Sequence, residues 1–79
     1  MSDKKVIIYS TPTCVYCKAA KEFLTSHNVA FEDYNVAEDA EKRSEMVEKS
    51  GQMGVPVIVV GDDMLVGFNQ SKLTELLGL

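Results

Sequence analysis

The chain has 79 residues, 46% of them hydrophobic and 25% charged, and its 8 basic and 12 acidic residues give a formal net charge of -4. These values predict one globular domain over residues 1–79 and exclude a disordered chain, a coiled coil and a basic surface for nucleic acid. The longest apolar run, residues 55–60, is far shorter than the ~18 residues of a transmembrane helix, so no membrane partner is expected.

The N-terminal segment and the two cysteines predict a cytoplasmic protein. Residues 1–5 are followed by only three aliphatic residues, fewer than the ~7 to 15 of a signal peptide. Cys14 and Cys17 are too few and too close in sequence to cross-link a small secreted domain. In a cytoplasmic chain this spacing indicates redox chemistry or metal binding.

The first half of the chain predicts a strand, a helix and a second strand. Residues 5–10 have aliphatic side chains at successive positions, as in a central strand buried on both faces. A turn follows at residues 11–13, and helix formers dominate residues 17–26, so we expect a helix that starts at the cysteines. Residues 30–36 alternate imperfectly and predict an edge strand. The expected inner face of the helix comprises Ala20, Phe23, Leu24 and His27.

The next segments predict a helix and a hairpin. Residues 39–50 predict a helix that Gly51 closes in the left-handed conformation. Two apolar runs, residues 57–60 and 64–66, flank a glycine-containing turn at residues 61–63 and predict a β-hairpin. The expected inner face of the helix comprises Ala40, Arg43, Met46 and Val47.

The last predicted element completes the fold. Residues 71–77 have leucines on one face and predict a helix, with Asn69 or Ser71 as its N-cap. The expected order is therefore β-α-β-α-β-β-α. A strand, helix and strand make a right-handed parallel crossover, and the hairpin adds antiparallel strands. We expect an α/β fold with a four-stranded mixed sheet and helices on both faces.

The cysteine pair indicates the chemistry. At the start of a helix, free backbone N–H groups and the helix dipole favour the thiolate form of Cys14. Lys18 and Lys21 add positive charge nearby, although lysines on a surface helix are more often only solvated. We expect Cys14 to attack a substrate disulfide, and Cys17, one turn away and more buried, to resolve the mixed disulfide.

Other interpretations of these motifs are an inert core pair and half of a zinc site. His27 is the only histidine and there is no second cysteine pair, so a closed zinc site lacks ligands and no metal is expected. The Val55–Pro56 step precedes the third predicted strand. Taken alone it is consistent with ordinary strand entry, because only ~5% of X–Pro bonds in folded proteins are cis.

Residues 11–18, Thr-Pro-Thr-Cys-Val-Tyr-Cys-Lys, and residues 54–57, Gly-Val-Pro-Val, resemble the glutaredoxin branch of the thioredoxin-fold family, and the likeness covers essentially the whole chain. The resemblance implies a thioredoxin-like fold and disulfide oxidoreductase activity. It implies that Pro56 is the family's cis-proline facing the cysteines, and that the Val55 backbone pairs with bound glutathione or peptide. Tyr16 matches the family's active-site tyrosine and would line the groove or merely cover the helix start. No tightly bound cofactor is expected, and glutathione is the expected co-substrate.

The chain departs from the family's pattern at three places. Val15 stands where glutaredoxins usually have proline, which alters the redox poise. Thr11 stands where they usually have a basic residue that pairs with a carboxylate. Residues 66–70 lack the usual acid that holds the glutathione amino group, although backbone N–H groups near Asn69 and Gln70 can still receive a carboxylate. We therefore expect weakened glutathione binding.

Two alternatives remain open within this resemblance. Gly67 and Phe68 also resemble the matching segment of ribonucleotide-reductase-type redoxins, which thioredoxin reductase reduces. A non-enzymatic module would instead hold an iron–sulfur cluster between two monomers through Cys14 and glutathione. We expect a monomeric enzyme that takes electrons from glutathione or thioredoxin reductase and acts on disulfide-containing or glutathionylated proteins. Its groove is expected to comprise Thr11, Tyr16, Val55, Pro56, Gly67, Asn69 and Gln70.

Overall fold

The structure is a computed structural model that describes residues 5–79. Residues 1–4, part of the segment that predicted the cytoplasm, lie outside this range. Within the described range, no helix has the length and apolar character needed to cross a membrane. The elements follow the predicted order: β1 (Val6–Ser10), α1 (Val15–Ser26), β2 (Glu32–Asn35), α2 (Ala40–Ser50), β3 (Val57–Val60), β4 (Asp63–Val66) and α3 (Gln70–Leu77).

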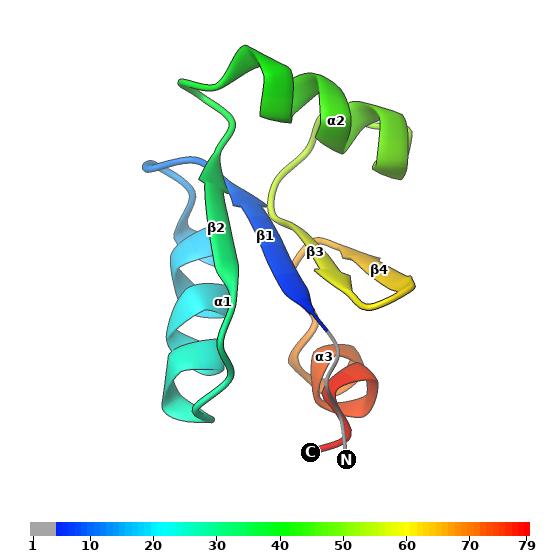
Figure 1. The fold of residues 1–79 in the computed structure, drawn as a ribbon. Helices are drawn as coiled ribbons and strands as arrows, with labels where there is room; N and C mark the ends of the chain where they lie inside the picture. Colours follow the sequence, from blue (N-terminus) through cyan, green and yellow to red (C-terminus); the bar gives the residue numbers. More distant parts are fainter. Residues whose placement is uncertain (1–4) are drawn as a thin grey trace.

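The strands form one mixed sheet in the order β2-β1-β3-β4. β1 is parallel to β2 and antiparallel to β3, and β3 is antiparallel to β4. Figure 1 shows the sheet at the centre, with α1 beside β2, α2 across the upper end and α3 at the lower end. The parallel crossover and the edge position of β2 are confirmed, although β2 is shorter than the predicted strand.

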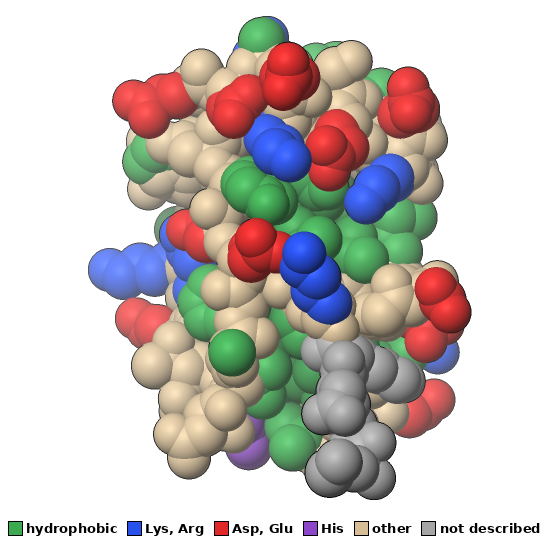
Figure 2. All heavy atoms as spheres, in the orientation of Figure 1, with side chains coloured by type: hydrophobic (Ala, Val, Ile, Leu, Met, Phe, Trp, Pro, Cys, Tyr) green, Lys and Arg blue, Asp and Glu red, His purple; other side chains and the backbone are tan. Residues whose placement is uncertain are grey.

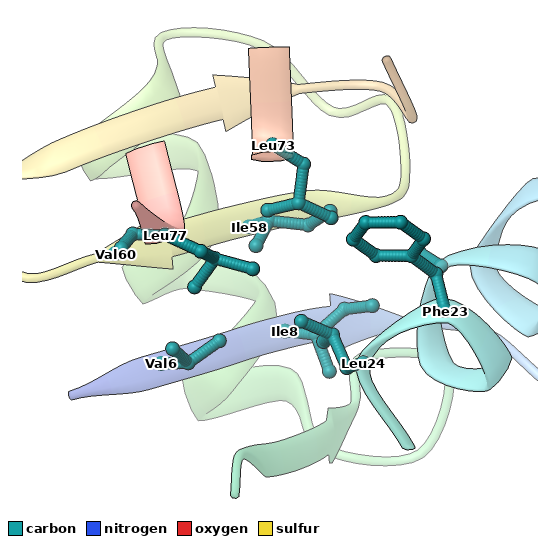
Figure 3. Close-up of a cluster of buried hydrophobic side chains, with 9 residues drawn as sticks. Val6, Ile8, Phe23, Leu24, Ile58, Val60, Leu73 and Leu77 are labelled. Atoms are coloured by element: carbon teal, nitrogen blue, oxygen red, sulfur yellow. The ribbon is translucent and has the colours of Figure 1, made fainter. Parts of the chain in front are cut away.

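One face of the sheet is covered by α1 and α3. Ile8 and Ile58 from the central strands, Leu24 from α1 and Leu73 from α3 are all fully buried on this side. Figure 3 shows their side chains converging between the sheet and the two helices. Each such side chain contributes about 1.5 to 3 kcal/mol by its burial. This packing fixes α1, and with it the cysteines at its start, against the central strands.

The opposite face is covered by α2, which packs over Tyr9 and Val57. Met46 is buried, as predicted, and so is Val36, whereas the other hydrophobic residues packed against this cluster are partly exposed. Figure 2 shows hydrophobic side chains at the surface below α2. Ile7 and Val59, which pack against the cluster on this face, are half-buried. Helices on both faces of a four-stranded sheet are therefore confirmed.

The predicted inner face of α2 is wrong in part. Ala40 and Arg43 are exposed. The helix instead turns Lys42 toward the sheet, with its ammonium 4.2 Å from the centre of the Tyr34 ring, while Glu45 accepts a hydrogen bond from β1. A cation over an aromatic face and a hydrogen-bonded carboxylate are both favourable, so these polar partners, together with buried Met46, stabilise this rotation of the helix. Hydrophobic spacing alone did not reveal them.

Three boundaries differ from their predictions by a few residues. α1 begins before Cys17, because Cys14 is its N-cap. β4 begins at Asp63, which pairs with the end of β3, so the turn of the hairpin is two residues long. Asn69 is the N-cap of α3, which therefore begins at Gln70. The N-cap prediction of Asn69 is confirmed over its alternative.

Gly51 and His27 lie at the C-terminal ends of their helices. Gly51 closes α2 with φ 75°, a left-handed conformation that glycine adopts without the strain of a side chain, as predicted. His27 does not lie on the buried face of α1. It is the C-cap and is exposed, with its ring centre 4.4 Å from that of Phe23. The helix ends before this position could turn inward.

Candidate active site

Cys14 is the N-cap of α1, at the end of the turn that follows β1. Its backbone is extended, and its Sγ accepts a hydrogen bond from the backbone N–H of Cys17 at 3.2 Å. This N–H is one of the donors that a helix start leaves without a backbone partner. A sulfur at this position also lies at the positive end of the helix dipole, where negative charge is favoured. Cys14 is half-buried and both cysteines are free thiols.

Cys17 lies directly behind Cys14 on the inner side of the first helical turn. Its side chain is fully buried. Burial, followed by the hydrogen bond with Cys14, raises the pKa of the Cys17 thiol to about 12. A backbone hydrogen bond from Thr11 and the charge of Lys21 act in the opposite direction. The two sulfurs therefore differ. The Cys14 sulfur reaches solvent and accepts a hydrogen bond, whereas the Cys17 sulfur is shielded from solvent and protonated.

The segment before β3 approaches Cys14 from the other side. The carbonyl oxygen of Val55 lies 3.9 Å from Cys14 Sγ. The Val55–Pro56 peptide bond is cis, as the family resemblance implied. The carbonyl oxygen of Thr11 accepts a hydrogen bond from the Cys14 N–H at 3.3 Å. Thus Thr11 and Val55, two of the predicted groove residues, contact the first cysteine through their backbones.

The end of β4 is joined to the same segment. The Gly67 N–H donates a hydrogen bond to the Pro56 carbonyl oxygen at 2.7 Å. Gly67 has φ 84°, and an added Cβ would meet nothing within 4 Å, so its conformation, rather than space, favours glycine there. Asn69 accepts a hydrogen bond from the Lys72 N–H at 3.1 Å as the N-cap of α3. Gln70 is exposed, and no hydrogen bond among the described residues joins Asn69 or Gln70 to the cysteines.

The surface beside Cys14 is apolar. Val15 and Tyr16, which separate the two cysteines, are 76% and 67% exposed. Met53, in the loop before the cis peptide, is 68% exposed as well, but it lines a hollow over α2 with Ala40 and Val47. Exposed hydrophobic side chains grouped near a reactive group are typical of a docking surface. Among residues 5–79, no group of three or more histidine, cysteine or acidic side chains has the arrangement of a metal site.

A chain of polar contacts beside Cys17 was missed in part from the sequence. Lys21 was recognised as a nearby charge, but its partners were not. Its Nζ donates to Asp33 Oδ2 at 3.0 Å, and Ser10 Oγ donates to Asp33 Oδ1 at 2.7 Å. The parallel pairing of β1 and β2 brings Ser10 and Asp33 together, with Ile8 opposite Asp33. Only this register, which no local motif reveals, would have identified the contacts.

Known proteins resemble this chain in sequence and fold. The glutaredoxin family model matches residues 6–65. A glutaredoxin-like 8.6 kDa protein in the rubredoxin operon of Clostridium pasteurianum is 50% identical over 70 residues, which cover 89% of this chain and 93% of that protein.

Two solved structures share the fold. Glutaredoxin grx-1 of Archaeoglobus fulgidus has a TM-score of 0.79 and 38% identity, and the match covers 94% of this chain and 86% of that one. NrdH-redoxin of Escherichia coli, a glutaredoxin-like protein with a thioredoxin-like activity profile, has a TM-score of 0.80 and 29% identity, over 91% and 93% of the two chains. With its thioredoxin-like fold and its Cys14–Cys17 pair, the chain belongs to the glutaredoxin family.

Proposed function

We propose that residues 1–79 act as a single-domain thiol–disulfide oxidoreductase that reduces protein disulfides or glutathione mixed disulfides. The observation that carries the proposal is the unequal cysteine pair. Cys14 Sγ receives an N–H donor at the helix start, while Cys17 is fully buried one turn away. The environment of Cys14 suits a nucleophile. The buried environment of Cys17 suits a resolving thiol, which acts only after the mixed disulfide has formed. The protein would work as a monomer in the cytoplasm, where thiols are kept reduced.

The reaction proceeds in two displacements. The Cys14 thiolate attacks one sulfur of the substrate disulfide, forms a mixed disulfide and releases the other sulfur as a thiolate. The Cys17 thiolate then attacks Cys14 Sγ, which forms the Cys14–Cys17 disulfide and releases the second sulfur of the substrate. The substrate gains two electrons and the cysteine pair loses two. An external thiol or a reductase then restores the dithiol.

The substrate would lie in the groove beside Cys14. The backbone of Val55, next to Pro56, would pair with an extended peptide or glutathione, and the approach of its carbonyl oxygen to Cys14 Sγ supports this role. Exposed Tyr16 supplies an apolar wall. The remaining residues that we assign to the groove are Thr11, Gly67, Asn69 and Gln70.

Thioredoxin reductase is a second candidate electron donor besides glutathione. Glutaredoxins bind glutathione with charged side chains at two positions where this chain has Thr11 and Asn69. The side-chain oxygen of Asn69 already caps α3. NrdH-redoxin of Escherichia coli, which matches this fold with a TM-score of 0.80, has a thioredoxin-like activity profile. Both observations favour a donor other than glutathione.

The test of the cysteine roles uses two single variants. Cys17→Ser should accumulate a mixed disulfide with substrate through Cys14, seen by intact-mass analysis, whereas Cys14→Ser should form none because Cys17 is buried. Trapping by Cys14→Ser instead would reverse the assignment. Turnover of a glutathione mixed disulfide with glutathione and its reductase, beside turnover with thioredoxin reductase, identifies the donor. Activity with neither system would refute the proposed function.

A further inference from the structure

The resolving step requires a thiolate at a buried sulfur. Cys17 is fully buried, and burial raises the pKa of its thiol to about 12. The step therefore needs a nearby group that favours the charged form once the mixed disulfide has formed on Cys14. The groups that act on the Cys17 thiol are few. They are Cys14 at the N-cap of α1, Lys21 within α1 and the backbone of Thr11 in the turn before it. Lys21 is in turn hydrogen-bonded to Asp33 of β2, and Asp33 to Ser10 of β1.

Among the residues on the inner side of α1, Lys21 carries the positive charge that is closest to Cys17 in sequence. It follows Cys17 by four residues, so the two side chains lie on the same face of α1. Its side chain is 31% exposed and its ammonium is anchored to Asp33. Lys18, by contrast, lies on the exposed side of the helix and forms no ion pair among the described residues.

Hydrogen bonds from two different elements hold the Asp33 carboxylate in place. Ser10, which is 2% exposed at the end of β1, donates to Asp33 Oδ1, while Lys21 donates to Oδ2. The two carboxylate oxygens thus have separate donors, one from the sheet and one from the helix. An ion pair on a flexible surface spends much of its time apart, but a carboxylate fixed by a buried hydroxyl restrains its lysine. The charge that Lys21 presents to Cys17 is therefore fixed in position.

We propose that Asp33, fixed by Ser10, is a positioning residue that holds the Lys21 ammonium beside Cys17, where its charge stabilises the thiolate that resolves the mixed disulfide. The inference rests on the proposed function and extends it to the second displacement. Lys21 exchanges no proton in this step. Cys17 releases its proton to solvent, its sulfur bonds to Cys14 Sγ, and the bond from Cys14 to the outer sulfur breaks.

A two-phase displacement separates the two steps. Reduced protein is mixed in a stopped-flow instrument with an aromatic disulfide whose thiolate product is coloured. Attack by Cys14 releases the first coloured thiolate, and attack by Cys17 releases the second. Lys21→Gln should slow the second release about threefold to tenfold between about pH 6 and 8, which corresponds to roughly half to one pKa unit at Cys17. The first release should be unchanged.

The controls separate charge from position. Lys49→Gln removes the same charge from the far face of the sheet and should leave both phases unchanged, and Lys21→Arg should restore most of the second. Ser10→Ala should slow the second phase about twofold, but not in a chain that already carries Lys21→Gln, because coupled residues do not act additively. Far-UV circular dichroism verifies that each variant is folded.

The possible outcomes distinguish the inference from the function on which it rests. If the unaltered protein releases only one coloured thiolate, the proposed function fails. If it releases two and Lys21→Gln behaves like the unaltered protein, or slows both releases equally, the inference about Asp33 and Lys21 is overturned. An equal effect of Ser10→Ala with and without Lys21→Gln would likewise overturn the positioning role.

Discussion

Replacing Tyr9 with phenylalanine tests how α2 is joined to the sheet. The Tyr9 hydroxyl, on a fully buried side chain, donates to Glu45 Oε1 at 2.6 Å. A hydrogen bond to a charged group contributes about 1.5 to 3 kcal/mol when shielded. The Glu45 side chain is 36% exposed, and water can replace the lost donor, so we expect Tyr9→Phe to lower the free energy of unfolding by about 1 kcal/mol.

The effect of Tyr9→Phe should depend on pH. The hydrogen bond from Tyr9 is the largest cause that lowers the pKa of Glu45 in the folded protein. Because the folded pKa lies below the unfolded one, this stabilisation is present above the unfolded value, about 4.3, and is lost as the pH falls through the folded value.

Urea unfolding of both proteins at about pH 7 and about pH 3 measures the difference. The gap between them should shrink in acid, and it should also shrink when Glu45→Gln is present in both chains. A gap that is the same at both pH values would refute the role of the charged acceptor.

Three further predictions concern the core, the groove and the chemistry. Leu73→Ala, at a fully buried contact of α3, should lower the free energy of unfolding in urea by about 3 kcal/mol, and a loss below about 1 kcal/mol would contradict the packing. Gly67→Ala should cost about 1 kcal/mol through its φ of 84°, and no change in midpoint would argue against that conformation. Because burial raises the pKa of Cys17 to about 12, the resolving rate should climb with pH across the neutral range, whereas a plateau below about pH 8 would indicate a lower value.

Much of the fold follows from local patterns in the sequence. The consecutive aliphatic residues of β1 predict a strand buried on both faces, and Ile8 and Tyr9 do lie in separate clusters on opposite faces. Gly51 marks the end of α2 because the left-handed cap favours a residue without a side chain. Such features depend on neighbouring residues only, so they can be read before the fold is known.

Features set by tertiary contacts could not be predicted in this way. The rotation of α2 depends on Lys42 and Glu45 meeting tyrosines from two different strands. The position of Asp33 next to Ser10 depends on the parallel register of β1 and β2. Hydrophobic periodicity carries no information about either contact, because each is made by polar side chains from two different elements.

Some features of the candidate site could be predicted from local sequence patterns, and others could not. Cys14 and Cys17 follow from their spacing before a helix, and the structure adds that Cys14 is itself the N-cap, with a backbone donor at 3.2 Å. The approach of Val55 to Cys14 joins segments 41 residues apart in sequence. Only the resemblance to a known family implied this contact, because no local pattern in the sequence links the two segments.

Reversible exchange of Cys14 and Cys17 between dithiol and disulfide is tested most directly by a redox titration. The protein is equilibrated in defined ratios of reduced and oxidised dithiothreitol, alkylated, and its free thiols are counted by intact mass. We expect both thiols to disappear together in one reversible two-electron transition, which Cys14→Ser and Cys17→Ser each abolish. Two thiols that remain open to alkylation after unfolding at every ratio would contradict a redox-active pair.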